Sequence, residues 1–423
     1  MAYLVNNFNY KEQQLHVEQL PVKKLAEQVK TPFYCYSQSS IEQAYRNYAD
    51  NLTELDTLIC YAVKANTNQA IIRTLAKLGA GADVVSAGEL KRALLAGVPA
   101  NKIVYSGVAK TENEIAFALE QNIFQFNLES ENELQRVSKI ASQLNKKAHI
   151  AFRINPDVDA KTHAKISTGM SENKFGIPIS RARAIYATAA SLPGIKIQGV
   201  DVHIGSQLTC LEPFDNAFRL IKELVVELRD DGHDIKIIDL GGGLGVKYKA
   251  GEMSDSAITE YCENVTCLFK DMNCTLVFEP GRSLVAESGI LVSSVVYKKR
   301  GEKRIFLIID AAMNDFIRPS MYDAYHDILA ISKTTKTEIY DVVGPVCESG
   351  DTFATQREMQ AVNEGDLVAI SMVGAYGAVM SSSYNTRLTA PEVLVKGNQF
   401  SVIKERPSYD DLIGLDKIPS WQE

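Results

Sequence analysis

Short apolar runs alternate with helix-patterned segments along the first two thirds of the chain. The runs are typical of β-strands, because they are short, rich in β-branched and aromatic residues, and followed by glycine or polar residues. The segments between them place apolar residues at three- and four-residue spacing, as in FDNAFRLIKELVVELRDDG (214–232). The predicted strands are ICYAVKAN (59–66), ADVVSAGE (82–89), KIVYSG (102–107), FQFNLES (124–130), AHIAFRIN (148–155), GVDVHIGS (199–206), IKIIDLGGG (235–243) and TLVFEPGR (275–282).

This alternation predicts an α/β fold of the (β/α)8, TIM-type barrel class. Eight strand-and-helix units over residues 59–282 match such a barrel in number and length. A doubly wound open sheet is the competing architecture. However, no early G-x-G-x-x-G turn opens a helix, and eight even units close more naturally into a barrel.

The pattern changes after Arg282. Strand-like stretches joined by Gly, Asn and charged turns dominate there, and helical patterning is limited to pieces such as YDAYHDILA (322–330). We expect a C-terminal all-β domain, a sandwich or barrel, joined by the N-terminal strand. The expected division is residues 1–32 packing with the β domain, 33–283 as the barrel and 284–423 as the β domain.

Composition narrows the class of partner. The chain has 423 residues and a formal net charge of −7, without a long basic run, which argues against nucleic-acid binding and an anionic membrane surface. No apolar stretch is long enough to span a bilayer, and the N-terminus lacks a secretory pattern. Seven scattered cysteines predict reduced thiols in a cytoplasmic setting. Cys262, Cys267 and Cys274 lack a CxxC pair, so we expect no metal site there.

Polar and glycine residues recur where the predicted strands end. In a (β/α)8 barrel these ends meet at one face, where the active site lies. Charged and polar residues recur at these strand ends, where apolar residues would be expected to fill the barrel. This repetition therefore indicates a single shared site. The residues at these ends are Lys64, Asn66, Ser86, Glu89, Arg153, Asn155, His203, Ser206, Gly241, Gly242, Gly243, Glu279, Gly281 and Arg282.

Together these residues predict a phosphorylated aldehyde cofactor. A lone strand-end lysine more often marks where a strand reaches the surface, and a glycine triplet is often only a tight turn. GGGLG and EPGR, however, follow the seventh and eighth strands, where barrels frequently bind phosphate. Pyridoxal 5'-phosphate would use this cradle, with Lys64 bonded to its aldehyde, His203 stacked on its ring and Glu279 at its ring nitrogen.

The chain resembles the fold-type III, pyridoxal-phosphate-dependent decarboxylases over nearly its whole length. The motifs that carry the resemblance are YAVKAN (61–66), HIGSQ (203–207), DLGGGLG (239–245), EPGR (279–282), RPSMYDAYH (318–326), GPVCESGD (344–351) and GAYG (374–377). RPSMYDAYH and CESGD are typical of the branch that acts on diaminopimelate. The resemblance implies decarboxylation of meso-2,6-diaminopimelate to L-lysine and CO2, the last step of lysine biosynthesis.

The resemblance also implies a role for each matching residue. Lys64 carries the cofactor, and Cys347 is the acid that returns a proton. The residues that match cofactor contacts are His203, Ser206, Gly242, Gly243, Glu279, Gly281, Arg282 and Tyr376. Those that match substrate contacts are Arg282, Arg318, Tyr322, Glu348 and Tyr376. In the family, CESGD comes from a second subunit, which implies a homodimer with shared sites.

Other activities remain open from the sequence. Decarboxylases of the same architecture act on carboxynorspermidine, ornithine or arginine, but ornithine has no distal carboxylate for Arg318 to bind. Alanine racemase typically has an arginine at the pyridine nitrogen, where this chain has Glu279. A non-catalytic pyridoxal-phosphate carrier would lack the β domain, and an inactive regulator would usually have lost Lys64 or Cys347.

Overall fold

The computed structural model describes residues 7–160, 174–249 and 251–422. It divides into two compact units, which we call the barrel unit (Glu42–Leu284) and the β unit (Met1–Ile41 with Val285–Glu423). The first boundary differs from the one expected after residue 32, because Phe33–Ser37 (β4) pairs with strands of the β unit. Residues 1–6 of the expected N-terminal segment lie outside the described residues.

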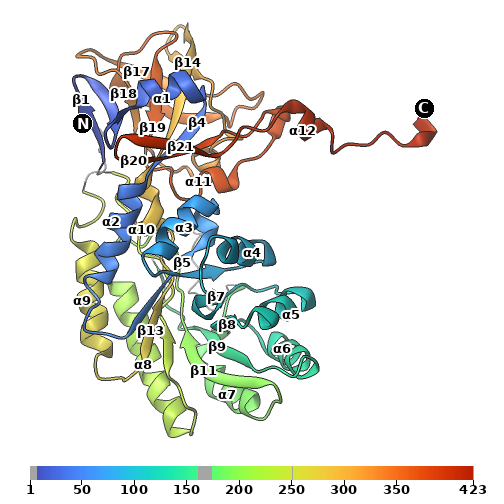
Figure 1. Cartoon of the computed structure of the whole chain (residues 1–423). Coiled ribbons are helices and arrows are strands. Elements are labelled where there is room, and N and C mark those ends of the chain that lie inside the picture. Colours follow the sequence, from blue (N-terminus) through green and yellow to red (C-terminus); the bar gives the residue numbers. More distant parts are fainter. Residues whose placement is uncertain (1–6, 161–173, 250, 423) are drawn as a thin grey trace. The chain divides into compact units, whose positions relative to one another are not determined.

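The barrel unit contains a closed ring of eight parallel strands surrounded by helices (Figure 1). Pairing of β8 with β9 closes the ring, and a short strand, Ile177–Pro178 (β10), adds to β9. The predicted barrel is therefore confirmed. In chain order the elements are α2 (Gln38–Ala49), β5 (Thr57–Ala62), α3 (Gln69–Lys77), β6 (Gly81–Val84), α4 (Ala87–Leu95), β7 (Ile103–Tyr105), α5 (Glu112–Gln121), β8 (Gln125–Leu128), α6 (Glu131–Gln143), β9 (Ala148–Asn155), α7 (Ala182–Ala190), β11 (Ile195–Asp201), α8 (Glu212–Asp230), β12 (Ile237–Asp239), α9 (Ala257–Phe269), β13 (Thr275–Phe278) and α10 (Arg282–Val285).

Polar residues that follow the early strands start the next helix. Asn68, Ser86, Thr111 and Ser130 each accept a backbone N–H of the first helical turn, at the N-termini of α3, α4, α5 and α6. Such caps satisfy donors that a helix cannot satisfy itself, and each is typically worth about 1 kcal/mol. Ser86 therefore has a structural role at its strand end.

Apolar side chains fill the barrel and the layer between barrel and helices. Cys60, Val104, Ile237 and Val277 form a buried cluster contributed by four different strands. Outside the ring, α8 buries one face of its 19 residues and is amphipathic for that reason. Aromatic rings join it to α9 and β13, with Tyr261 against Phe214, Phe218 and Phe278.

The β unit is built on a mixed sheet in the order β18-β17-β15-β14-β4-β20-β21, with β19 joined to β14 and β16. A small antiparallel sheet of β1, β2 and β3 precedes it. The prediction of a separate β domain is confirmed. Its elements are β1 (Phe8–Lys11), β2 (Gln14–Val17), β3 (Leu20–Pro21), α1 (Val22–Val29), β4 (Phe33–Ser37), β14 (Gly289–Arg300), β15 (Ile305–Ile309), α11 (Arg318–Tyr322), β16 (Ile328–Ala330), β17 (Thr337–Val343), β18 (Thr352–Gln360), β19 (Leu367–Ile370), β20 (Glu392–Lys396), β21 (Gln399–Lys404) and α12 (Tyr409–Ile413).

The helix-like pattern at residues 322–330 was misleading, and the prediction of a helix there is wrong. The helix α11 ends at Tyr322, because Asp323 adopts the left-handed conformation with φ 51°. The apolar residues Ile328–Ala330 form β16, which pairs with β19. Tertiary pairing therefore overrides the local pattern.

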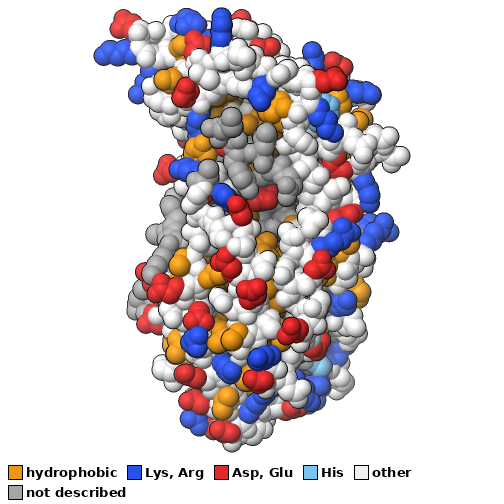
Figure 2. All heavy atoms as spheres, turned by 90° about the vertical axis from the view of Figure 1, so that its left-hand side faces the viewer, with side chains coloured by type: hydrophobic (Ala, Val, Ile, Leu, Met, Phe, Trp, Pro, Cys, Tyr) orange, Lys and Arg blue, Asp and Glu red, His pale blue; other side chains and the backbone are white. Residues whose placement is uncertain are grey.

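Within the described residues, no helix is both long enough and apolar enough to cross a membrane. On the face drawn in Figure 2, acidic and basic side chains are interspersed among the described residues, and no broad basic patch covers that face.

Candidate active site

Lys64 lies directly after the first barrel strand, in a 3-10 turn formed by Val63–Ala65. Its Nζ is 2.5 Å from Oδ2 of Asp83, which belongs to the neighbouring strand β6. The Asp83 side chain is fully buried, whereas that of Lys64 is 38% exposed. The strand therefore ends where the lysine can leave the core, and a buried carboxylate holds its amine at the barrel mouth.

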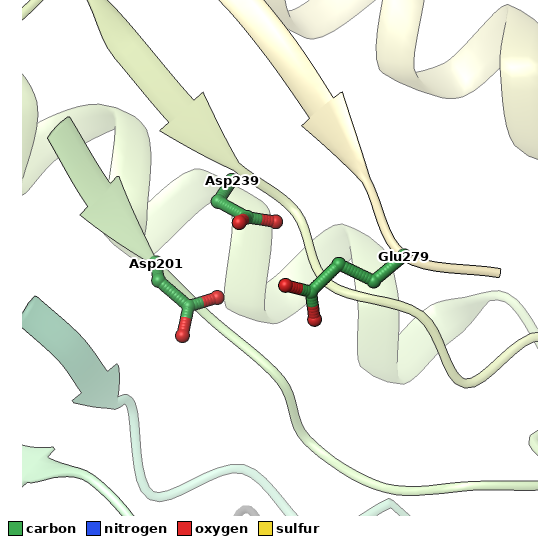
Figure 3. A group of neighbouring side chains, drawn as sticks. All are labelled: Asp201, Asp239 and Glu279. Atoms are coloured by element: carbon green, nitrogen blue, oxygen red, sulfur yellow. The ribbon is translucent and has the colours of Figure 1, made fainter. Parts of the chain in front are cut away.

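Three further carboxylates converge at the same end of the barrel, from three neighbouring segments (Figure 3). Asp201 ends β11, Asp239 ends β12, and Glu279 follows β13 directly. All three are buried, and one oxygen of each lies within 4.8 Å of one oxygen of the others. Negative groups this close, with little water, attract a proton or a cation.

The electrostatics of this carboxylate cluster follow from its burial. Desolvation, and then the charges of Asp239 and Asp83, raise the pKa of Glu279 well above its usual value. The pKa of Asp239 rises to about 8, first through desolvation and then through Asp201. The pKa of Asp201 is also raised well above its usual value, by desolvation and then by Glu279. A positively charged ring placed against Glu279 would relieve this repulsion.

An amide orients the carboxylate cluster from inside the barrel. Nδ2 of Asn127 donates to Oδ2 of Asp239 at 3.1 Å and to Oε1 of Glu279 at 3.3 Å. Gln125 fixes the amide, because its Nε2 donates to Oδ1 of Asn127 at 2.8 Å. The hydroxyl of Ser106 donates to Oε1 of Glu279 at 3.4 Å. Glu279 is therefore held in one orientation by donors from β8 and from the end of β7.

His203 lies beside these groups as a neutral ring. Its Nδ1 accepts the backbone N–H of Gly242 at 3.1 Å, which an imidazolium nitrogen could not do. Desolvation, and then the charges of Arg153 and Lys64, lower the pKa of His203 well below its usual value. Nη2 of Arg153 donates to the carbonyl oxygen of His203 at 3.0 Å, and its Nη1 pairs with Glu129. Gly242 thus fixes the ring, and Arg153 fixes the backbone that carries it.

The glycine loop after β12 packs too closely for any other residue. A Cβ on Gly242 would lie 2.2 Å from the carbonyl oxygen of Glu279, and one on Gly243 would lie 2.4 Å from that of Gly205. Gly243 also has a φ of 115°, which L side chains rarely adopt. Bare backbone thus reaches the barrel mouth, where its N–H groups can bind an anion.

Arg282 and Ser206 lie next to this loop. Nη2 of Arg282 donates to Oγ of Ser206 at 3.1 Å, and Nη1 donates to the hydroxyl of Tyr248 at 2.9 Å. Gly281 packs against Ala62 and Ala65, so it borders the Lys64 turn. The structure therefore brings together, at one end of the barrel, every barrel residue that the sequence singled out for the cofactor.

The remaining predicted residues belong to the β unit, where α11 with Arg318 and Tyr322 is joined to the turn with Cys347 and Glu348. The guanidinium of Arg318 lies 5.8 Å from the ring centroid of Tyr322, and its Nε is 3.5 Å from Nε2 of His326. Ser320 donates to the carbonyl oxygen of Gly350 at 2.5 Å and so joins α11 to the turn that carries Cys347 and Glu348. Tyr376 lies apart in the chain, in the left-handed conformation with φ 55°.

Sequence reasoning missed four residues of the barrel mouth. Asp83, Asn127, Asp201 and Asp239 sit inside strands that otherwise look like core, and all four are buried. The available signal was one or two polar residues in each of the otherwise apolar runs ADVV, FQFN, GVDV and IIDL. A single Asp or Asn near a strand end is usually explained as the start of a turn, so this signal was weak.

Comparison with known proteins identifies the site. A family profile described as "Pyridoxal-dependent decarboxylase, pyridoxal binding domain" matches residues 38–286. The chain belongs to the pyridoxal-dependent decarboxylases. The resemblance derived from its motifs is confirmed, and the barrel unit is the part of this decarboxylase that binds the cofactor.

Relatives of this decarboxylase match it along almost their whole length. It is 47% identical to proteins named diaminopimelate decarboxylase from Zymomonas mobilis and Pseudomonas aeruginosa, over 98% of this chain and 99% of each relative. Its fold matches the crystal structure of diaminopimelate decarboxylase from M. jannaschii in complex with L-lysine, with a TM-score of 0.94, 39% identity and 99% of both chains covered. The corresponding Helicobacter pylori complex gives a TM-score of 0.90 at 42% identity, covering 93% of this chain and 98% of that one.

The barrel residues fit pyridoxal 5'-phosphate, the cofactor of this family. Among the described residues, Oδ1 of Asp83 and Oδ1 of Asp201 are buried without a hydrogen-bond partner, so the site has polar oxygens that the chain itself leaves unsatisfied. The glycine cradle and Arg282 suit a phosphate, and the buried Glu279 suits a protonated pyridine nitrogen. The decarboxylase therefore has the donors and acceptors that this cofactor needs.

Proposed function

We propose that this protein decarboxylates meso-2,6-diaminopimelate to L-lysine and CO2, the last step of lysine biosynthesis. The observation that carries the chemistry is Lys64 at the barrel mouth, 2.5 Å from the buried Asp83. The observation that supports this choice of substrate is the 47% identity, over nearly the whole chain, to a protein named diaminopimelate decarboxylase. The bound pyridoxal 5'-phosphate supplies an electron sink for the pair left on the substrate carbon when CO2 departs.

Each barrel residue has a defined task in this proposal. Lys64 provides the amine that would hold the cofactor through its aldehyde. Glu279, held by Asn127 and Ser106, keeps the ring nitrogen protonated. The neutral His203 stacks on the ring face. The residues that would hold the phosphate are Ser206, Gly242, Gly243, Gly281 and Arg282 of the barrel unit, together with Tyr376 of the β unit.

The distal end of the substrate needs recognition of a carboxylate and an ammonium. We assign the carboxylate to the guanidinium groups of Arg282 and Arg318, because planar forks bind carboxylates with two hydrogen bonds. Tyr322 and Tyr376 complete this subsite. Glu348 faces the distal ammonium. Arg318 is buried against Tyr322 and His326, so its guanidinium is already ordered before the substrate binds.

Cys347 is the proposed proton donor to the substrate carbon after CO2 has left. Its thiol carries a transferable proton, and its backbone N–H is fixed by Oδ1 of Asn385 at 3.1 Å. Cys347 and Glu348 are exposed in the single chain, as are Ser349 and Gly350. A decarboxylation site works best with water excluded, so this turn needs a cover.

We therefore propose a homodimer in which the Cys347–Gly350 turn of each copy completes the site of the other. Exposure of the turn and of the Cys347 thiol supports this arrangement. We further propose a cytoplasmic location. All seven cysteines are free in the structure, as expected for a reducing compartment.

The decisive experiment is a substrate panel. Purified holoenzyme is incubated separately with meso-diaminopimelate, L-ornithine, L-arginine and L-lysine, and CO2 and amine products are measured. We expect CO2 and L-lysine from diaminopimelate only. Release of CO2 from ornithine but not from diaminopimelate would overturn the assignment of the substrate. The LL isomer of diaminopimelate serves as a matched control for stereochemistry.

A further inference from the structure

The last residues of the chain form a C-terminal arm, which we define as residues 407–422. It contains the short helix α12 and then continues beyond the strands β20 and β21 of its own unit (Figure 1). The arm exposes large apolar side chains at a density unusual for a protein surface. The exposed fractions are 59% for Tyr409, 55% for Ile413, 79% for Leu415, 76% for Ile418 and 84% for Trp421.

The arm is ordered locally but anchored only at its base. Nη2 of Arg406 donates to the carbonyl oxygens of Pro32 at 2.8 Å and Lys30 at 3.2 Å, which fixes the point where the arm leaves the β unit. Beyond it, Ser408 caps α12 in a reciprocal capping box. Among the described residues, the hydrogen bonds found for 408–422 all stay within the arm. The arm therefore holds a defined shape while its apolar side chains face water.

The base of the arm connects to the turn that carries Cys347. Thr31, whose carbonyl oxygen also accepts from Arg406, donates from its hydroxyl to Asp310 at 2.6 Å. Three residues later, the N–H of Met313 donates to Oδ1 of Asp351, the residue that ends the turn. Residues 310–313 of the β unit are thus bonded both to the base of the arm and to the end of the Cys347–Gly350 turn. The base of the arm and the end of the Cys347–Gly350 turn are therefore held by the same short segment.

We propose that the C-terminal arm packs against a second copy of this chain and stabilises the dimer. This proposal rests on the homodimer of the proposed function. A second copy is favoured over an unrelated partner because residues 310–313 bond both to the base of the arm and to Asp351, next to the turn that the proposed dimer covers. The side chains that dock are Tyr409, Ile413, Leu415, Ile418 and Trp421.

Trp421 gives a direct readout, because it is the only tryptophan in the chain. Its emission and acrylamide quenching are measured on holoenzyme at concentrations where sedimentation shows the dimer, with Trp421→Phe as the blank. We expect Trp421 of the dimer to emit at a shorter wavelength than in the urea-unfolded chain. We also expect acrylamide to quench it several-fold less than it quenches the unfolded chain. Emission and quenching of a fully hydrated tryptophan in the assembled enzyme would overturn the proposal.

Cross-linking distinguishes an arm that docks on a second copy of the chain from an arm that folds back onto its own chain. Lys417 lies in the middle of the arm and offers a native amine. Holoenzyme is prepared from mixed 14N- and 15N-labelled chains and treated with an amine-reactive linker. We expect Lys417 links that join chains of different label. Lys417 links confined to chains of one label would show that the arm docks on its own chain and would refute the proposal.

Variants test the contribution of the arm to assembly. Leu415→Ser with Ile418→Ser removes two apolar anchors, and we expect the dimer dissociation constant to rise about tenfold or more for each. Asp416→Asn, between Leu415 and Ile418, is the control and should leave the dimer dissociation constant unchanged. Circular dichroism confirms that the variants fold. An unchanged constant in the double variant refutes the proposal, whereas a dimer that releases no CO2 from diaminopimelate refutes the function alone.

Discussion

The amine of Lys64 and the carboxylate of Asp83 lie 2.5 Å apart at the mouth of the barrel, one partly exposed and the other fully buried. Lys64 follows β5 and Asp83 lies in β6, and these two strands pair in parallel. Asp83 thus provides a fixed negative charge that keeps the lysine at the position where the cofactor aldehyde binds. Substitution of Lys64 or Asp83 is therefore expected to change both the attachment of the cofactor and the unfolding free energy of the protein.

Lys64→Ala should abolish covalent attachment of the cofactor. It also leaves Asp83 without this ammonium, so we expect the cofactor-free protein to lose about 1–3 kcal/mol of unfolding free energy. The double variant Lys64→Ala/Asp83→Asn should lose less than Lys64→Ala alone, because no buried charge remains at that position. Urea unfolding and borohydride trapping with peptide mapping measure these effects. Attachment of the cofactor at a residue other than Lys64 would contradict the assignment. Lys139→Ala on α6 is the control and should leave attachment unchanged.

Glu279→Gln should lower kcat without removing the cofactor. The amide cannot hold the ring nitrogen protonated, and losing one electrostatic contact of this kind costs about 10²–10³ in rate. Lys64 still binds the aldehyde, so the absorbance of the bound cofactor should persist. Steady-state kinetics on diaminopimelate tests the change, with the exposed Glu263→Gln on α9 as the matched control. A kcat equal to that of the unmodified enzyme would exclude the role.

The stability of the cofactor-free protein should fall as pH rises. Asp239 has a pKa of about 8 in the folded protein, against its usual 3.8. Between about pH 4 and pH 8 the folded state therefore keeps a proton that the unfolded chain has lost, and the free energy of unfolding decreases across this window. Urea unfolding at pH 5, 6.5 and 8 measures it. Asp239→Asn should weaken this pH dependence, although the raised pKa values of Asp201 and Glu279 keep part of it, and the exposed Asp234→Asn should leave it unchanged.

Cys347→Ala should bind substrate normally but turn it over slowly. Loss of a positioned proton donor typically costs about 10²–10⁴ in rate, so kcat should fall by this factor with little change in KM. The exposed Cys210→Ala is the matched control. If Cys347→Ala turns over at the original rate, another group returns the proton.

Arg318→Lys should impair recognition of the distal carboxylate. A lysine cannot offer the planar pair of donors, and the loss of one charge-assisted hydrogen bond lowers kcat/KM by about 10- to 100-fold. The exposed Arg183→Lys on α7 should have no effect. Equal kcat/KM for diaminopimelate in Arg318→Lys and in the unmodified enzyme would remove Arg318 from the substrate site.

The sequence by itself determined the barrel, the β domain and the barrel residues assigned to the cofactor. Strand and helix periodicity are local, and short motifs such as YAVKAN and EPGR place Lys64 and Glu279 at strand ends without knowledge of the fold. The pattern at residues 322–330 shows the limit of this reasoning. Pairing of Ile328–Ala330 with β19 decided its structure, and that partner is distant in the chain.

Only the tertiary structure revealed the buried environment of the site. Asp83, Asn127, Asp201 and Asp239 lie on four different strands, and each alone resembles an ordinary polar residue at a strand end. Closure of the barrel brings them together with Glu279, and the loss of water there gives the carboxylates their raised pKa values. Burial and proximity belong to the folded chain, because they depend on segments that only folding makes neighbours.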